Sequence, residues 1–379
     1  MPRLILDFFI ASLLLLGGIF LVIYRENAVF DVREVGTVPS IEFSDTSPFY
    51  PIVFSEVLEV EDEEAEDAID TSEPISQAEK INTVEEPIPE SPSKQIASTA
   101  ITTSSIESAT SVLRNALVNI VCYAPQGSNI RSISGSGVFI DPKGIILTNA
   151  HIAQYFLLSE RGVSCGVRTG APAIDAYRAS LLFISSEWIE ENAELIVKPA
   201  PSGTGEHDFA LLAVTKSISQ FRPLPEQFPF ISLANDPVDR DTPVVIGGYG
   251  AQFLGAEQIQ FMLFPTLVFG VVKDIFTFSS NTVDVLALGG SAAAQQGSSG
   301  GGVADASGKL VGTIVTSTQE KITSERSLDA ITASYIRGAY ATESGEALDL
   351  LIERSLAESI ANFESKKKEL ETTLAGFLN

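Results

Sequence analysis

Three polar residues stand in segments suited to nucleophilic catalysis, in the order His151, Asp208 and Ser299. His151 lies near the end of GSGVFIDPKGIILTNAHI, where an expected strand stops at a turn of small residues. Asp208 opens an apolar strand in EHDFALLAV, and Ser299 lies among glycines in QGSSGGGV. A serine nucleophile needs an imidazole base, and that base needs an acid to hold its Nδ1 hydrogen. The three segments together predict a Ser-His-Asp triad.

The choice of base is narrow because the chain has only two histidines. His207 is the competitor for His151, but it adjoins Asp208, and alternation along a strand would point the two side chains to opposite faces. The predicted chemistry requires no metal and no organic cofactor. The two cysteines do not lie close together in the sequence as zinc ligands would.

The elements that must position these residues are short, apolar, β-branched segments separated by Gly, Pro, Asn and Asp. Strands of this length and spacing predict an all-β sandwich or barrel, and the absence of long amphipathic helices between them argues against a βαβ sheet. A helical repeat of apolar residues predicts one amphipathic helix within 341–379. The strands are expected at 118–123, 137–140, 144–148, 209–214, 243–246, 266–272, 282–288 and 310–315, and the helix repeat is Leu356, Ile360, Phe363, Leu370, Leu374 and Phe377.

The first hundred residues differ in composition from the rest of the 379-residue chain. Phe8–Tyr24 is an uncharged run, just long enough to cross a bilayer, and no small-residue cleavage site follows it. We therefore expect a transmembrane anchor at 1–24, inserted through residues 4–24, rather than a cleaved signal peptide. The stretch 25–105 is acidic and rich in proline, which predicts a disordered linker. The net charge of -25 argues against nucleic acid as a partner.

The chain resembles the chymotrypsin-fold serine peptidases, and among them the HtrA-like, Deg-type branch. The resemblance rests on GSGVFID and TNAHI around His151, HDFALL around Asp208, VVIGGYG before residue 251, GSSGGG around Ser299, and GKLVGTIV at 308–315. It implies two six-stranded antiparallel Greek-key barrels with the active site between them, in a peptidase domain at 106–340. It also implies polypeptide substrates.

The resemblance further assigns the residues around the reacting atoms. The backbone N–H groups of Gly297 and Ser299 would form the oxyanion hole. Ala293, six residues before the nucleophile, and its neighbour Ala294 would lie at the base of the main specificity pocket, which favours small or medium aliphatic side chains over Lys and Arg. The substrate backbone would add as a strand along Val315, Thr316 and Ser317.

Some positions depart from the branch pattern. Ser298 stands where Asn or Asp is usual, and Gly302 where Pro is common, although both leave the turn at Ser299 feasible. Too few residues follow Tyr340 for a PDZ domain, so the resemblance is to a branch member without one. Cys122 and Cys165 do not occupy the disulfide positions that flank the histidine in digestive relatives, and either a disulfide or two buried thiols fits the sequence.

These observations predict a single-pass membrane protein whose serine endopeptidase domain faces the outside of the cell membrane and acts on unfolded or exposed polypeptide. Two other interpretations remain open. The peptidase fold could be a catalytically inactive binding module, or the protein could be a tethered assembly protein that works through its C-terminal helix. The same helix could instead pack on its own barrel, and a homo-oligomer is compatible with each interpretation.

Overall fold

The computed structural model of the protein describes residues 103–198, 203–278, 281–317 and 326–378. The chain divides into two units, Met1–Ser47 and Pro48–Asn379, and every described residue belongs to the second. The predicted anchor at 1–24 and nearly all of the predicted linker at 25–105 lie outside the described residues. In the ranges that the structure describes, no helix is both long and apolar enough to cross a membrane.

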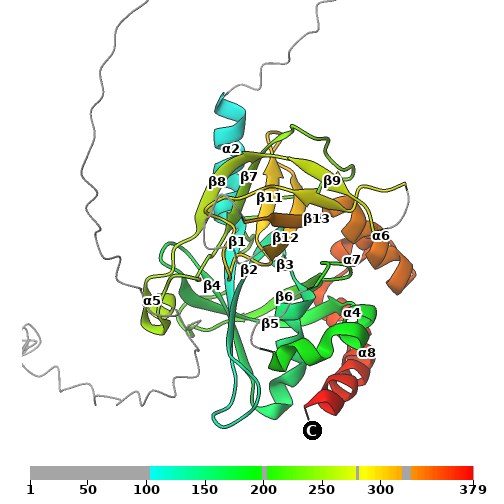
Figure 1. Ribbon diagram of the computed structural model, residues 1–379. Coiled ribbons are helices and arrows are strands. Elements are labelled where there is room, and N and C mark those ends of the chain that lie inside the picture. The colour runs from blue at the N-terminus through cyan, green and yellow to red at the C-terminus, as the bar shows by residue number, and fades with distance from the viewer. Residues whose placement is uncertain (1–102, 199–202, 279–280, 318–325, 379) are drawn as a thin grey trace, which may run out of the picture. The chain divides into compact units, whose positions relative to one another are not determined.

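The first sheet is a closed antiparallel barrel of six strands in the order β1-β2-β3-β6-β5-β4 (Figure 1). Closure comes from the pairing of β1 with β4, in which Asn119 lies opposite Arg168 and Cys122 lies opposite Cys165. The predicted first barrel is therefore confirmed. Its strands are β1 (Leu117–Tyr123), β2 (Ile133–Asp141), β3 (Ile145–Thr148), β4 (Ser164–Thr169), β5 (Ile174–Ile184) and β6 (Ala210–Ser217).

The second sheet differs from the predicted closed, six-stranded barrel. It has seven antiparallel strands in the order β8-β7-β11-β12-β13-β10-β9, and no pairing between β8 and β9 closes it within the described residues. The two edge strands, β8 and β9, follow one another in the chain but do not pair, and residue alternation within each strand does not report whether they pair. The strands are β7 (Pro243–Gly248), β8 (Thr266–Val271), β9 (Asp274–Phe276), β10 (Val285–Ala287), β11 (Gly302–Asp305), β12 (Leu310–Ser317) and β13 (Leu328–Thr332).

Five strands were not expected from the sequence, namely β4, β5, β9, β11 and β13. The first half of β5 is polar and only partly buried, so it lacks an apolar run, and β9 is only three residues long. The strand β11 begins at Gly302, directly after the glycine-rich turn at Ser299. Short or polar strands of this kind are recognised by their partners rather than by their own pattern.

Short helical segments connect the strands of the two sheets. The helix α3 (Ala150–Ala153) continues into η1 (Gln154–Arg161), and α4 (Ser186–Asn192) continues into η2 (Ala193–Val197). Between β7 and β8 lies α5 (Ala256–Phe261). Ahead of the barrel, α2 (Thr103–Ala116) begins inside the predicted linker and packs on β7 and β11 with Leu113 and Ala116 fully buried.

Three helices, rather than one, follow the second sheet: α6 (Ala333–Ser344), α7 (Leu348–Glu353) and α8 (Leu356–Phe377). Gly345, with a φ of 76°, ends α6, and the Ser355 hydroxyl accepts a hydrogen bond from Glu358 N at the start of α8. The helix α8 packs against β5 and α4 of the first barrel (Figure 1), where Phe363 lies 6.5 Å from Phe183 between ring centroids. Leu370 and Leu374 are buried there, so the apolar face of α8 is occupied by its own domain.

Cys122 and Cys165 form a disulfide between the paired strands β1 and β4. The sequence was compatible with either a disulfide or two buried thiols, and the structure shows the disulfide.

Candidate active site

The catalytic pair expected from the sequence is assembled. His151 Nδ1 lies 2.7 Å from Asp208 Oδ2, and the backbone N–H of His151 donates to the other carboxylate oxygen, Oδ1, at 2.9 Å. An ionised carboxylate only accepts hydrogen bonds, so this contact assigns the proton to Nδ1 and leaves Nε2 as the basic nitrogen. The Asp208 side chain is 9% exposed and that of His151 19% exposed, so part of the His151 side chain remains accessible to solvent.

Local structure explains how His151 and Asp208 meet. The barrel pairs Thr148 at the end of β3 with Ala210 at the start of β6, so the residues beyond these two strand ends are neighbours. His151 lies in the short helix α3 after β3, and Asp208 lies just before β6. Asn149 Nδ2 donates to the Asp208 backbone carbonyl at 2.8 Å and links the two segments further.

Ser299 lies on the turn before β11 of the second sheet, and this turn packs directly on the first barrel. Ser136 N in β2 donates to the Ser299 carbonyl at 2.8 Å, and Ser136 Oγ donates to the Gly297 carbonyl at 2.7 Å. A Cβ atom at Gly300 would lie 2.6 Å from Thr148 Oγ1, three residues before His151. Within the described part of the chain, Ser299 Oγ and His151 form no hydrogen bond.

The backbone before Ser299 presents two N–H groups. Neither Gly297 N nor Ser299 N donates a hydrogen bond within the described ranges. The Gln296 carbonyl accepts from Ala251 N at 2.7 Å, and in a trans peptide the following N–H points the opposite way. Gly297 has a φ of 94°, and a Cβ there would lie 2.7 Å from the Tyr249 carbonyl, so this position requires glycine.

The residues expected to bind substrate lie in the second sheet. Ala293 and Ala294 are fully buried in the loop before the turn. In β12, Thr316 and Ser317 pair with β13, while β11 pairs with β12 only as far as Thr313. The strand therefore has an unpaired edge from Val315 onward among the described residues, as strand addition by a peptide requires.

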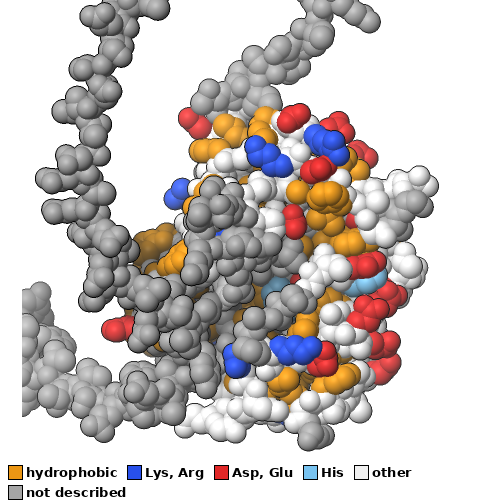
Figure 2. All heavy atoms as spheres, in the orientation of Figure 1, with side chains coloured by type: hydrophobic (Ala, Val, Ile, Leu, Met, Phe, Trp, Pro, Cys, Tyr) orange, Lys and Arg blue, Asp and Glu red, His pale blue; other side chains and the backbone are white. Residues whose placement is uncertain are grey.

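His207 is held away from the pair, for a different reason from strand alternation. It lies in a turn with a φ of 55°, not in a strand, and its Nε2 lies 2.9 Å from Glu187 Oε2 in α4. In Figure 2 the histidine colour appears at two places on this face, one of them bordered by acidic side chains. The His207 side chain is therefore held by Glu187, which leaves Asp208 to His151.

Two tyrosines beside the site are held neutral by burial. Burial raises the pKa of Tyr249 to about 12, and its hydroxyl donates to the Gly170 carbonyl at 2.9 Å. Burial also raises the pKa of Tyr335 to about 12, partly offset by the hydrogen bond that His207 N donates to its hydroxyl. Both side chains act as structural contacts at neutral pH.

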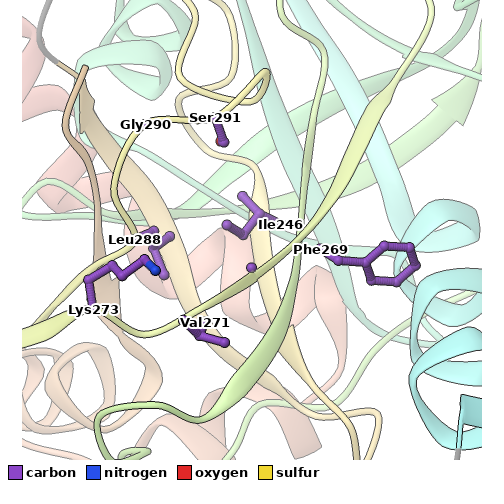
Figure 3. A pocket seen from close by; sticks show the side chains of 8 residues that line it. Ile246, Phe269, Val271, Lys273, Leu288, Gly290 and Ser291 are labelled. Atoms are coloured by element: carbon purple, nitrogen blue, oxygen red, sulfur yellow. The ribbon is translucent and has the colours of Figure 1, made fainter. Parts of the chain in front are cut away.

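A shallow pocket lies on the second sheet, apart from the residues predicted for catalysis (Figure 3). Its lining comes from β7, β8, the connection between β8 and β9, and the loop after β10, and Figure 3 shows the Phe269 ring pointing away from Lys273 and Leu288. None of the triad or oxyanion residues contributes to it. The lining residues are Ile246, Phe269, Gly270, Val271, Lys273, Leu288, Gly290 and Ser291.

Several residues that build the site were not predicted from the sequence. Ser136 is fully buried, and its hydroxyl also accepts from Tyr249 N at 2.7 Å, so it joins β2 to both loops of the second sheet. Asn149 and Arg326 were also missed. Ser136 could have been found as the small residue between two glycines in GSGVF, and Asn149 as the asparagine before Ala150. No local sequence pattern marks Arg326.

The fold and the His151–Asp208 pair define a chymotrypsin-type serine peptidase. Residues 135–312 match the family described as trypsin-like peptidase domain, so the chain contains such a domain and is a serine endopeptidase.

Two solved structures illustrate the similarity. The Rv3671c protease from M. tuberculosis in its active form has 20% sequence identity and a TM-score of 0.40, over 69% of this chain and 94% of that one. The inactive form of the same protease has 18% identity and a TM-score of 0.38, over 62% and 92% of the two chains. No curated protein sequence matches this chain.

Proposed function

We propose that the protein cleaves polypeptides through an acyl-enzyme formed on Ser299. The observation that carries the proposal is the double contact of Asp208 with the ring and the backbone of His151. Ser299 Oγ attacks the scissile carbonyl carbon while His151 Nε2 takes the hydroxyl proton. His151 then gives that proton to the leaving amine, and activates a water molecule that hydrolyses the ester. Asp208 stabilises the imidazolium that forms twice in the cycle.

The free N–H groups of Gly297 and Ser299 support the electrostatic part of this mechanism. Each would donate to the oxyanion of the tetrahedral intermediate, and one such donor is worth about 3 kcal/mol of barrier in other enzymes. Hydrogen bonds between nucleophile and base are often long in unliganded enzymes and tighten in the substrate complex. The lack of a Ser299–His151 hydrogen bond among the described residues is therefore compatible with this mechanism.

The triad is tested by Ser299→Ala and His151→Ala in the full chain. Each should lower kcat by on the order of 10⁶, and the double variant by little more, because the triad acts as a unit. The control is His207→Asn, which suits the positive φ at that position and should keep most of the activity. Peptide hydrolysis and circular dichroism are the measurements. More than a few per cent activity in a folded Ser299→Ala chain would refute the assignment.

Cleavage preference is a second, separate part of the proposal. Buried Ala293 and Ala294 leave no acidic group at the expected pocket base, so cuts should follow Val, Ala, Ile or Leu. Mass spectrometry of the fragments of unfolded casein would locate the cut sites. Dominance of Lys or Arg before the cut would show that the pocket lies elsewhere.

We further propose that the domain is anchored through residues 4–24 and works outside the cell membrane, in quality control or regulated proteolysis as in the HtrA-like branch. The Cys122–Cys165 disulfide supports an oxidising compartment. The inactive-module alternative is separated by a fluorophosphonate probe, which labels Ser299 only in a working site. The packing of α8 on its own barrel favours the enzyme over the assembly protein.

A further inference from the structure

Arg326 is a buried cation next to the catalytic turn. It precedes β13 and is 4% exposed. Its Nη1 donates to the Ala294 carbonyl and to Gln252 Oε1, each at 3.0 Å, and its Cζ lies 5.2 Å from the centroid of the Phe253 ring. Burying a guanidinium is costly unless its N–H groups have hydrogen-bond acceptors. The contacts of the Arg326 side chain therefore restrain the segments that contain Gln252 and Ala294.

The contacts join the two loops that set the direction of the oxyanion donors. Gln252 and Phe253 belong to the loop after β7, and Ala294 belongs to the loop that leads to Ser299. The same two loops share the hydrogen bond from Ala251 N to the Gln296 carbonyl, which orients the Gln296–Gly297 peptide. Arg326 therefore holds the loops beside the peptide whose N–H the mechanism uses.

The loop before Ser299 contributes small side chains to the core of the second sheet, among them the buried Ala293 and Ala294. Residues 289–294 read GGSAAA, and such small side chains make few contacts. Between the two loops, a Cβ at Gly250 would lie 3.0 Å from Gln295 Oε1, so the Gln295 side chain packs against the backbone at Gly250. The position of the oxyanion donors then depends on the hydrogen bonds that tie one loop to the other.

We propose that Arg326 is a positioning residue, which clamps the loop after β7 to the loop before Ser299 and so keeps Gly297 N–H aligned with the oxyanion. This inference rests on the proposed function. It predicts that loss of the clamp weakens transition-state binding and leaves the binding of the ground-state substrate nearly unchanged.

The test compares Arg326→Gln and Arg326→Lys with the wild-type full chain in detergent. Arg326→Gln should lower kcat about 10- to 100-fold with KM within about threefold, because the donors are misaligned rather than removed. Arg326→Lys keeps one charged donor and should recover part of the loss. The control is Arg337→Gln, which removes a guanidinium paired with Asp349 on α7, and should leave kcat unchanged.

The affinity of a peptide boronate, compared with that of a product peptide, distinguishes loss of the oxyanion hole from a general loss of stability. The tetrahedral boronate adduct on Ser299 uses the oxyanion hole, so the affinity of the boronate should fall in parallel with kcat/KM across the variants, while the affinity of a non-covalent product peptide stays constant. If Arg326→Gln does not fold, Gln252→Ala removes one partner of the clamp and should give a smaller loss of the same kind.

The possible negative results distinguish the Arg326 proposal from the proposed function. Folded variants with wild-type kcat and boronate affinity would overturn the clamp while leaving the proposed function intact. A changed preference for the residue before the cut, with kcat unchanged on the new preferred substrate, would place Arg326 against the substrate and also overturn it. A wild-type chain that neither cleaves peptides nor reacts with a fluorophosphonate at Ser299 would refute the proposed function and the clamp together.

Discussion

At the scale of single residues, the site depends on positions where the backbone leaves no room for a side chain, as well as on its functional groups. The turn at Ser299 approaches the first barrel so closely that a Cβ at Gly300 would lie 2.0 Å from the Ser136 carbonyl oxygen. Gly300 also has a φ of 82°, which L residues rarely adopt. The glycine is what allows the turn that carries Ser299 to pack against β2 of the first barrel.

We expect Gly300→Ala to lower activity at least about 100-fold, because relieving the clash must move the neighbouring Ser299 away from β2, and small displacements of a reacting group are costly. Gly308→Ala is the matched control, since Gly308 has a φ of 77° but a methyl group there would meet no atom within 4 Å. Both variants carry the left-handed strain of about 1–2 kcal/mol. Equal peptidase activity in the two would contradict the close approach.

At the scale of elements, Arg168 connects the two sheets. This buried residue of β4 donates from Nη2 to the Ala173 carbonyl at 2.6 Å, and its guanidinium also reaches the carbonyls of Ile259 and Gln260 at the end of α5. Tyr249 OH adds a second link to the β4–β5 connection through the Gly170 carbonyl. The loop that holds the oxyanion turn is therefore itself anchored to the first barrel.

Arg168→Met should lower the free energy of unfolding by about 3 kcal/mol and the Tm by on the order of 10 °C, since buried carbonyls lose charged donors. Thermal unfolding followed by circular dichroism measures the change. Arg222→Met, at an exposed position, should shift the Tm by less than about 2 °C. A similar Tm for the two variants would show that the Arg168 contacts do not stabilise the fold.

At the scale of the whole molecule, the folded domain is preceded by about a hundred residues of contrasting composition. The uncharged run at 8–24 and the acidic, proline-rich stretch at 25–105 predict an anchor followed by a tether. Such a tether would leave the active site free to act on polypeptides near the membrane surface.

Limited proteolysis of intact cells or sealed vesicles should therefore release a soluble, active fragment that begins near Thr103. The tether is expected to be cleaved easily, whereas α2 and the two sheets are packed. The Ser299→Ala chain is the control for self-cleavage. Release only after the membrane is broken would place the domain in the cytoplasm, and a soluble mature chain beginning near residue 25 would identify a signal peptide.

The sequence by itself determined the residues of the His151–Asp208 pair, the glycine-rich turn at Ser299 and most strands of the first barrel. These features are local, because turn geometry, glycine and short apolar runs act over a few neighbouring positions. The C-terminal helical repeat was recognised for the same reason and corresponds to α8, whereas α6 and α7 were not expected, because they depend on ends such as that at Gly345 and on packing against neighbouring elements.

Only the tertiary structure decided how these parts meet. The hydrogen bond between Asp208 and His151 spans 57 residues of sequence, and the one between Ser136 and Gly297 spans 161. The contacts of Arg326 are likewise long-range, at separations of 74 residues to Gln252 and 32 residues to Ala294. Sequence spacing carries no distance information across such separations, because the pairing of strands, and not the chain between them, brings the residues together.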